Sequence, residues 1–241
     1  MAPRFHCPEL LPESGDWPLP AAVAHHALRV LRLKEGAAVV LFDGSGAEVE
    51  ATLHGRGSQA MARILSRRML SRESPLRIVL VQALASADKM DWVVQKAVEL
   101  GVARVQPVRA TRSVLKLTGE RAEKRLAHWR EVAVSACEQS GRNRVPLVAD
   151  ILDLQAYLAE PAAGVERWVL DPAQGRSLSA LAAPQGECHV LIGPEGGWSE
   201  EELQACQAAA CTAVTLGPRV LRTETAGLAM LAGMQALWGD F

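Results

Sequence analysis

The fold is decided by residues 191–203, which read LIGPEGGWSEEEL. An apolar run typical of a buried strand ends here in three glycines around a carboxylate. Ser199 then opens a helix, with Glu202 at the spacing of a capping box. Glycines at the carboxyl end of a parallel strand let the backbone approach a ligand closely. An ordinary strand-to-helix turn also explains these glycines, and their spacing matches neither a Walker loop nor the dinucleotide-binding fingerprint.

A second stretch of the same kind lies at residues 216–226, which read LGPRVLRTETA. It also follows an apolar run and opens a helix, for which Thr223 is the expected N-cap. Two such loops at one sheet edge form a crevice suited to a ligand. Arg219 and Arg222 either face solvent or belong to this crevice. The apolar pair between them, which a solvent-exposed loop does not need, favours the crevice.

Strand and helix patterns alternate through the second part of the chain. Asp88 is the expected N-cap of the first helix, and Gly101 is expected to end it. This alternation predicts an α/β domain with a parallel sheet covered on both faces. The expected strands span residues 76–80, 102–108, 168–170, 189–192 and 214–216, and the expected helices span 89–100, 120–137 and 226–238.

The first part of the chain has a different pattern and ends in the polar segment 71–75, SRESP, a plausible linker. Residues 37–54 predict a hairpin, because two strand-like runs flank the turn-forming sequence DGSG. Its second strand alternates Glu48, Glu50 and Thr52 with apolar residues, as a half-buried strand does. With one short helix near residues 25–31, residues 1–72 form a small, mostly β domain, and residues 73–241 form the α/β domain.

Charge is distributed unevenly along the 241 residues, although the net charge is only −1. Residues 104–144 carry ten Lys/Arg and four Asp/Glu, whereas residues 145–241 carry four and twelve. Such pooling of basic charge fits a polyanionic partner, although a solvated helix face is the favoured interpretation of residues 118–130. Residues 142–144, Arg-Asn-Arg, follow the expected helix end at Gly141. They either grip phosphates through their guanidinium groups or form a hydrated loop.

The remaining signals are weaker. The five cysteines form no CxxC pair, so we expect no metal site and a reducing, cytoplasmic setting. No secretion signal is expected in residues 1–20, and the apolar run 226–237 is too short to span a bilayer. The pair His25-His26 could touch RNA, but one packed and one exposed ring is the favoured interpretation.

On these residues the sequence resembles the RsmE family, the 16S ribosomal RNA uridine-N3 methyltransferases of the SPOUT superfamily. The resemblance runs along the whole chain. It rests on residues 29–32 (RVLR), 42–44 (FDG), 95–101 (QKAVELG), 137–146 (CEQSGRNRVP) and the two glycine-bearing loops. It implies a PUA-like β-barrel RNA-binding domain over residues 1–72 and a knotted SPOUT methyltransferase domain, with a C-terminal trefoil knot, over residues 73–241. The knot rests on the resemblance alone, because general topology rules argue against it.

The resemblance also implies S-adenosylmethionine as cofactor, 16S rRNA, within the 30S subunit, as substrate, and a homodimer without a metal ion. Arg219 or Arg222 would stabilise negative charge on the uridine, and Glu224 or Glu195 would take the N3 proton; the sequence assigns neither role. RNA would contact Arg29, Arg32, Arg142, Asn143 and Arg144. The cofactor would contact Leu170, Ile192, Gly193, Glu195, Gly196, Gly197, Leu216, Gly217, Val220, Leu221, Arg222 and Thr223.

Two alternatives stay open. The chain could be a SPOUT methyltransferase acting on another rRNA or tRNA position, or a non-catalytic RNA-binding assembly factor. The glycine-bearing loops favour an enzyme, because binding RNA alone requires no buried ligand crevice.

Overall fold

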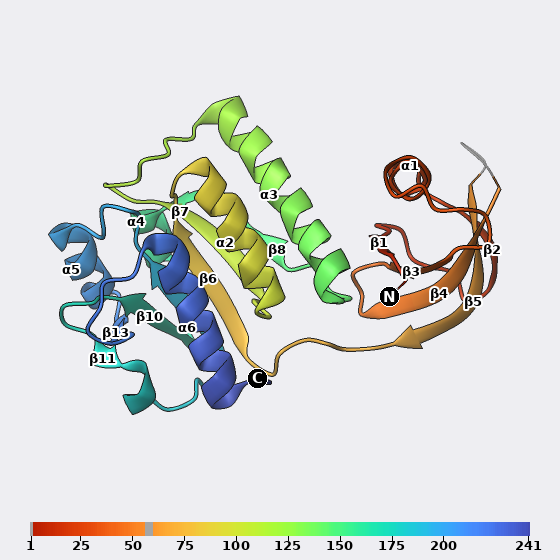
Figure 1. Ribbon diagram of the computed structural model, residues 1–241. Coiled ribbons are helices and arrows are strands. Elements are labelled where there is room, and N and C mark those ends of the chain that lie inside the picture. The colour runs from red at the N-terminus through yellow and green to blue at the C-terminus, as the bar shows by residue number, and fades with distance from the viewer. Residues whose placement is uncertain (1, 56–59) are drawn as a thin grey trace. The chain divides into compact units, whose positions relative to one another are not determined.

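The computed structural model describes residues 2–55 and 60–241 and separates the chain into two units (Figure 1). The first unit comprises Met1–Glu73 together with Cys137–Val145, and the second comprises Ser74–Ala136 and Pro146–Phe241. The sequence placed residues 137–145 in the second domain. The structure groups them with the first unit, because their side chains make their hydrogen bonds there.

The first unit is built on a five-stranded sheet in the order β1-β3-β4-β5-β2. As the sequence predicts, β3 and β4 form an antiparallel hairpin, and the Asp43 carboxylate holds its turn by accepting a hydrogen bond from the Ser45 backbone N–H. The strands are β1 (Arg4–His6), β2 (Gly15–Pro18), β3 (Ala38–Phe42), β4 (Ala47–His54) and β5 (Met61–Met69).

A helical segment covers the core of this unit. It consists of α1 (Ala21–His25) followed by a π-helical turn, η1 (His26–Val30), where the sequence predicted one short helix over 25–31. The core side chains come from alternate positions of the hairpin strands and include Val39, Leu41 and Val49. As expected of the histidine pair, His25 is exposed, while the His26 ring is partly buried and packs edge-on against Phe5.

The alternation on β4 differs from the sequence prediction at one position. Glu50 is exposed, but Glu48 is buried, with a relative exposure of 1%. Its carboxylate is neutralised by the guanidinium groups of Arg4, Arg68 and Arg72. A charged side chain is buried here because ion pairs and hydrogen bonds replace its hydration.

The second unit is an eight-stranded, all-parallel sheet (Figure 1). Seven strands follow the order β11-β13-β10-β12-β6-β7-β8, and β9 also pairs with β7. The sequence predicted the five longest strands but missed the two-residue ones, which are too short to show a pattern. The strands are β6 (Arg77–Ala83), β7 (Arg104–Arg109), β8 (Leu147–Val148), β9 (Leu152–Asp153), β10 (Val165–Leu170), β11 (Arg176–Ser177), β12 (Glu187–Ile192) and β13 (Thr212–Thr215).

Helices cover both faces of this sheet, as the alternation predicts. Helices α2 and α6 pack together on one face, and α4 and α5 cover the other (Figure 1). Helix α2 begins earlier than expected, with Ser86 rather than Asp88 at its N-cap, and it ends before Gly101 as predicted. The helices are α2 (Ala87–Glu99), α3 (Gly119–Ser140), α4 (Leu154–Ala159), α5 (Glu200–Ala208), α6 (Thr223–Trp238) and the short 3-10 helix η3 (Leu178–Ala180).

Alternate residues of β6 supply the two faces of the core. Val79 and Val81 pack towards α4 and α5, while Leu80 lies beneath α6. A Cβ on Gly227 of α6 would lie 3.4 Å from the side chains of Leu80 and Ile192, which is ordinary van der Waals contact. Helix α6 therefore packs directly on the sheet where β12 ends, next to the glycine-bearing loops. No helix among residues 2–55 and 60–241 is long and apolar enough to cross a membrane.

Candidate active site

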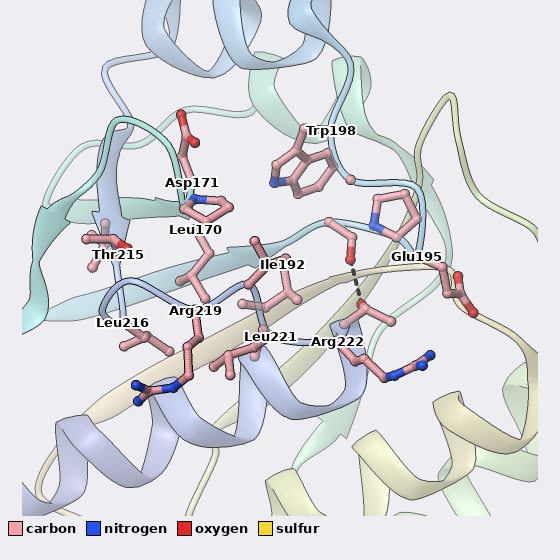
Figure 2. Close-up of a pocket in the computed structure, with 18 of the residues that line it drawn as sticks. Leu170, Asp171, Ile192, Glu195, Trp198, Thr215, Leu216, Arg219, Leu221 and Arg222 are labelled. Carbon is pink, nitrogen blue, oxygen red and sulfur yellow. Dashed lines mark hydrogen bonds between the residues drawn. The ribbon is translucent and has the colours of Figure 1, made fainter.

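Three loops at the carboxyl edge of the sheet enclose a cavity of about 350 Å³ (Figure 2). They follow β10, β12 and β13, and the two glycine-bearing stretches are the second and third of them. This volume lies within the range of small-molecule sites, about 300–1,000 Å³. The structure thus places both motifs around one pocket at a sheet edge that commonly binds ligands.

The pocket has apolar walls and a charged rim. Figure 2 shows Leu170, Ile192, Leu216 and Leu221 around its interior, with Glu195 and Arg222 on one side and Asp171 and Thr215 on the other. Of the residues that the sequence assigned to the cofactor, those lining the pocket are Leu170, Ile192, Gly193, Glu195, Gly197, Leu216, Val220, Leu221, Arg222 and Thr223. Arg219 and Arg222, assigned to catalysis, also line it.

Gly196, Gly217 and Glu224 do not line the pocket. Gly196 packs against the loop after β7: a Cβ there would lie 3.0 Å from Cβ of Arg112, whose guanidinium donates to the Gly196 carbonyl oxygen. Gly217 adopts φ +103°, which its turn requires. Both glycines shape the loops from behind the pocket.

Gly193 and Gly197 line the pocket for different reasons. A Cβ on Gly193 would lie 3.3 Å from the indole of Trp198, so this glycine lets the Trp198 ring close the pocket wall. Gly197 has open space around a Cβ but adopts φ +69°. The sequence predicts that a side chain at Gly197 would block the approach of a ligand, and this stays a prediction. Apart from any ligand, the turn has a backbone conformation that residues with a side chain rarely adopt.

The Thr223 hydroxyl makes hydrogen bonds to two other elements of the pocket region. The sequence predicted Thr223 as the N-cap of α6, but the N-cap is Arg222, and Thr223 is the first helical residue. Its Oγ1 donates to the Gly193 carbonyl oxygen at 2.5 Å, the bond drawn in Figure 2, and accepts from Gln82 Nε2 at 2.9 Å. One buried hydroxyl therefore joins α6, β6 and the first glycine-bearing loop.

The predicted capping box at the start of α5 is confirmed. Ser199 Oγ accepts from the Glu202 backbone N–H, and the Glu202 carboxylate accepts from the Ser199 backbone N–H. The same carboxylate accepts from the Thr111 backbone N–H at 2.7 Å, which fastens the loop after β7 to this helix end. The end of the first glycine-bearing loop is thus fixed at its helical side.

A lysine that the sequence analysis missed lies on the rim. Lys89, in the first turn of α2, lines the pocket, and its Nζ lies 3.4 Å from Glu195 Oε1 and 3.3 Å from Glu224 Oε2. No local motif marks Lys89, because its partners are more than a hundred residues away. Glu224 therefore stands behind the rim and is connected to it through Lys89.

Glu195 is held as an anion. Its carboxylate accepts from the Ser86 backbone N–H at 2.9 Å and pairs with Lys89. Burial alone raises the pKa of Glu195, but these backbone and lysine interactions outweigh it, so the pKa lies below its ordinary value. Glu195 is consequently a weak proton acceptor at neutral pH.

The residues assigned to RNA divide into two groups, both in the first unit. Arg29, Arg32 and Arg144 are exposed. The assignment of Arg142 and Asn143 to RNA is wrong, because their relative exposures are 4% and 1%. The Arg142 guanidinium pairs with Glu73. The Asn143 side chain accepts from Arg4 at 2.5 Å and donates to the Leu70 carbonyl oxygen at 3.0 Å.

The described residues contain no cluster of three or more His, Cys, Asp or Glu that could hold a metal ion. A hydrogen-bond donor does face the pocket without a partner: Nε1 of Trp198 is buried and makes no hydrogen bond to any described residue. A buried N–H usually has an acceptor, so this indole is suited to donate to a bound molecule.

Comparisons with known proteins agree with this geometry. A family model described as an RNA methyltransferase domain matches residues 72–235, and one described as an RNA methyltransferase PUA domain matches residues 19–60. The ribosomal RNA small subunit methyltransferase E of Bacillus subtilis is 30% identical over 232 residues, which cover 92% of this chain and 90% of the relative.

Two solved structures are similar over the full length of both chains. One is a ribosomal RNA small subunit methyltransferase E from Neisseria gonorrhoeae bound to S-adenosylmethionine, with 42% identity and a TM-score of 0.93. The other is a methyltransferase from Legionella pneumophila in complex with the same cofactor, with 32% identity and a TM-score of 0.95.

Proposed function

The chain belongs to the ribosomal RNA small subunit methyltransferase E family, and we propose that it methylates N3 of a uridine in the decoding region of 16S rRNA. The family named from the sequence motifs is confirmed, as are the SPOUT-type α/β fold with its PUA-like first domain and the S-adenosylmethionine-dependent rRNA methyltransferase activity. The trefoil knot and the domain boundary after residue 72 stay predictions. The choice of uridine N3 is our proposal.

The pocket residues fit S-adenosylmethionine. The cavity is large enough for a small molecule, its walls are apolar, and Trp198 Nε1 is a buried donor without a partner. Ile192, Leu216 and Leu221 would contact the adenosine, and backbone groups at Gly193 and Leu221 would pair with its polar edges. When bound, the cofactor supplies a methyl group already activated by the positive sulfur.

The residues of the chain must then prepare the uridine. N3 carries a proton at neutral pH and is a poor nucleophile until that proton leaves, so the site must favour the anionic base. N3 lies on the pairing edge, so the base must be unpaired or flipped to reach the pocket. Exposed guanidinium groups at Arg219 and Arg222 would stabilise negative charge as it develops on the base.

RNA phosphates would bind to the first unit through Arg29, Arg32 and Arg144, which are exposed. We expect the double variant Arg32→Ala with Arg144→Ala to weaken binding of 16S rRNA and to lower the slope of log affinity against log salt by about 1 per lost contact. Arg63→Ala is the control, because Arg63 is an exposed arginine of the same unit that pairs with Asp16. An unchanged slope in the double variant would refute this RNA surface.

The assembled context is also part of the proposal. We expect a homodimer acting in the cytoplasm on rRNA within the 30S particle, without a metal ion. Support for the dimer comes from α6, whose apolar residues continue to its end and leave Leu237 about half exposed.

The observation that carries the proposed function is the pocket formed by the two glycine-bearing loops in a chain of this family. The test is methyl transfer from labelled S-adenosylmethionine to naked 16S rRNA and to 30S particles, followed by nucleoside-resolved mass spectrometry. We expect 3-methyluridine at one position. A methyl group elsewhere in rRNA or tRNA would favour another SPOUT specificity, and no transfer at all would favour a non-catalytic assembly factor.

A further inference from the structure

Lys89 couples two carboxylates that come from different elements. Its ammonium lies between Glu195, in the loop after β12, and Glu224, in the first turn of α6. An ammonium has three donors, and contacts of 3.3–3.4 Å are longer than a strong charged hydrogen bond. Lys89 also lines the pocket, so its ammonium can donate to a molecule bound there.

The two carboxylates are not equivalent. Glu195 accepts the Ser86 backbone N–H as well as pairing with Lys89. For Glu224, Lys89 is the one partner among the described residues, and its Oε2 makes no hydrogen bond of good geometry. The buried Glu224 Oε2 therefore has unused acceptor capacity directly behind the pocket-lining Lys89, whereas the Glu195 carboxylate already accepts a backbone hydrogen bond.

Resting on the proposed function, we propose that Lys89 and Glu224 together recognise the imide edge of the target uracil and that Glu224 takes its N3 proton. Uracil presents a carbonyl oxygen beside the N3–H group. An ammonium beside a carboxylate is the complementary pair, because Lys89 donates to the carbonyl oxygen and Glu224 accepts from N3–H. Lys89 lines the pocket and Glu224 lies directly behind it, so the Glu224 side chain must turn towards the pocket to reach the base.

The same pair rejects cytosine. Cytosine presents an amino group where uracil has O4, and an unprotonated nitrogen at N3. With the base held so that Lys89 meets the 4-position and Glu224 meets N3, Lys89 would face a donor and Glu224 would face a lone pair, so both would lose a partner. Unpaired buried polar groups discriminate between bases more strongly than pocket shape does.

The proton step balances within the proposed pair. The N3–H bond breaks, its electron pair stays on N3, and an O–H bond forms on the Glu224 carboxylate. The Lys89 ammonium stabilises the negative charge that the base shares with its carbonyl oxygens. The side chain of Glu224 is about one-fifth exposed, which leaves a route for the proton to solvent.

The test compares Lys89→Met and Glu224→Gln with Lys96→Met and Glu99→Gln. Lys96 lies on the same helix as Lys89, has a similar side-chain exposure (29% against 25%) and pairs with Glu99 at 2.8 Å. Neither Lys96 nor Glu99 lines the pocket. The probes are two 16S rRNA fragments that carry uridine or cytidine at the methylated position, bound in the presence of S-adenosylhomocysteine.

We expect the parent protein and both control variants to prefer the uridine fragment by about tenfold or more. Lys89→Met and Glu224→Gln should reduce this preference to within about twofold while their calorimetric affinity for S-adenosylmethionine stays within about threefold of the parent. Glu224→Gln should also lower kcat far more than it raises KM.

A uridine preference that survives both substitutions would overturn the inference, as would a loss of preference that only accompanies loss of cofactor binding. The proposed function is tested by a different result: it is wrong if the parent protein makes no 3-methyluridine. If the parent makes it and the variants keep their preference, the Lys89–Glu224 assignment alone is wrong.

Discussion

Replacement of Thr223 by valine is the sharpest test of how the pocket is held together. Valine keeps the shape of the side chain and removes the hydroxyl, which bonds to the Gly193 carbonyl oxygen at 2.5 Å and to Gln82 Nε2 at 2.9 Å. Both partners lose a hydrogen bond in a buried site. A buried polar group without its partner costs about 1–3 kcal/mol. Gln82 Nε2 keeps its bond to the Ala83 carbonyl oxygen, so we expect a total loss of about 2–4 kcal/mol.

The assay is urea denaturation followed by tryptophan fluorescence, because five of the six tryptophans lie in the second unit. Calorimetry with S-adenosylmethionine reports on the loop itself. Without the hydroxyl, ligand binding must order the Gly193 loop, and an additional cost of about 1.4 kcal/mol weakens affinity about tenfold.

Thr225→Val is the matched control. Thr225 lies in the same first turn of α6, is exposed and makes no side-chain hydrogen bond with a described residue. Its replacement should change stability by less than about 0.5 kcal/mol, and Thr223→Ser should recover most of the loss. Equal effects of the two valine substitutions would refute the role of the Thr223 hydroxyl in joining α6 and β6 to the Gly193 loop. Normal cofactor affinity in a destabilised Thr223→Val would show that the hydroxyl supports the fold and not the pocket.

Three further predictions concern a buried ion pair, a turn and a helix cap. Although burial alone raises the pKa of Glu48, its hydrogen bonds to Arg4, Asn143, Arg68 and Arg72 lower it to about 2. Above pH 4.5, ionised Glu48 therefore contributes about 3 kcal/mol to the free energy of unfolding, and this contribution is lost as the pH falls towards 2. Denaturation measured over this pH range should show the loss in the parent chain and a flatter profile in Glu48→Gln. Gly197→Ala should cost about 1 kcal/mol in denaturation, because alanine must adopt φ +69°; full stability would show that the turn relaxes freely. Ser199→Ala should cost about 1 kcal/mol by removing the cap of α5, whereas Glu202→Ala should cost more because it also frees the Thr111 N–H; the reverse order, measured by the same denaturation, would contradict the dual role of Glu202.

Features that depend on neighbours in sequence were predictable. The hairpin of β3 and β4, the capping box at Ser199 and the end of α2 at Gly101 each arise from residues a few positions apart. The alternation of strands and helices also placed both glycine-bearing loops at one edge of a parallel sheet, because the carboxyl ends of parallel strands point the same way.

Features set by distant residues were not predictable. Thr223 has the residue type and position of a helix cap, but the Gly193 carbonyl oxygen, brought near by the fold, takes its hydroxyl. Arg142 has the local sequence of an RNA-binding loop, but Glu73 pairs with its guanidinium and burial removes it from solvent. In both cases a partner that is distant in the sequence decides what the side chain binds, and the flanking residues give no sign of that partner.

The distribution of charge supports the proposed assignment of cofactor binding and RNA binding to different units. At the pocket, Lys89, Arg219 and Arg222 face Asp171 and Glu195, with Glu224 directly behind Lys89, so the rim carries nearly balanced charge. Balanced charge suits a cationic cofactor and an uncharged base, but it offers little attraction to a phosphate backbone. Residues 145–241, which form most of the pocket, are strongly acidic. We therefore expect the affinity for RNA to come mainly from arginines outside the pocket, and we expect salt to weaken the binding of RNA much more than the binding of cofactor.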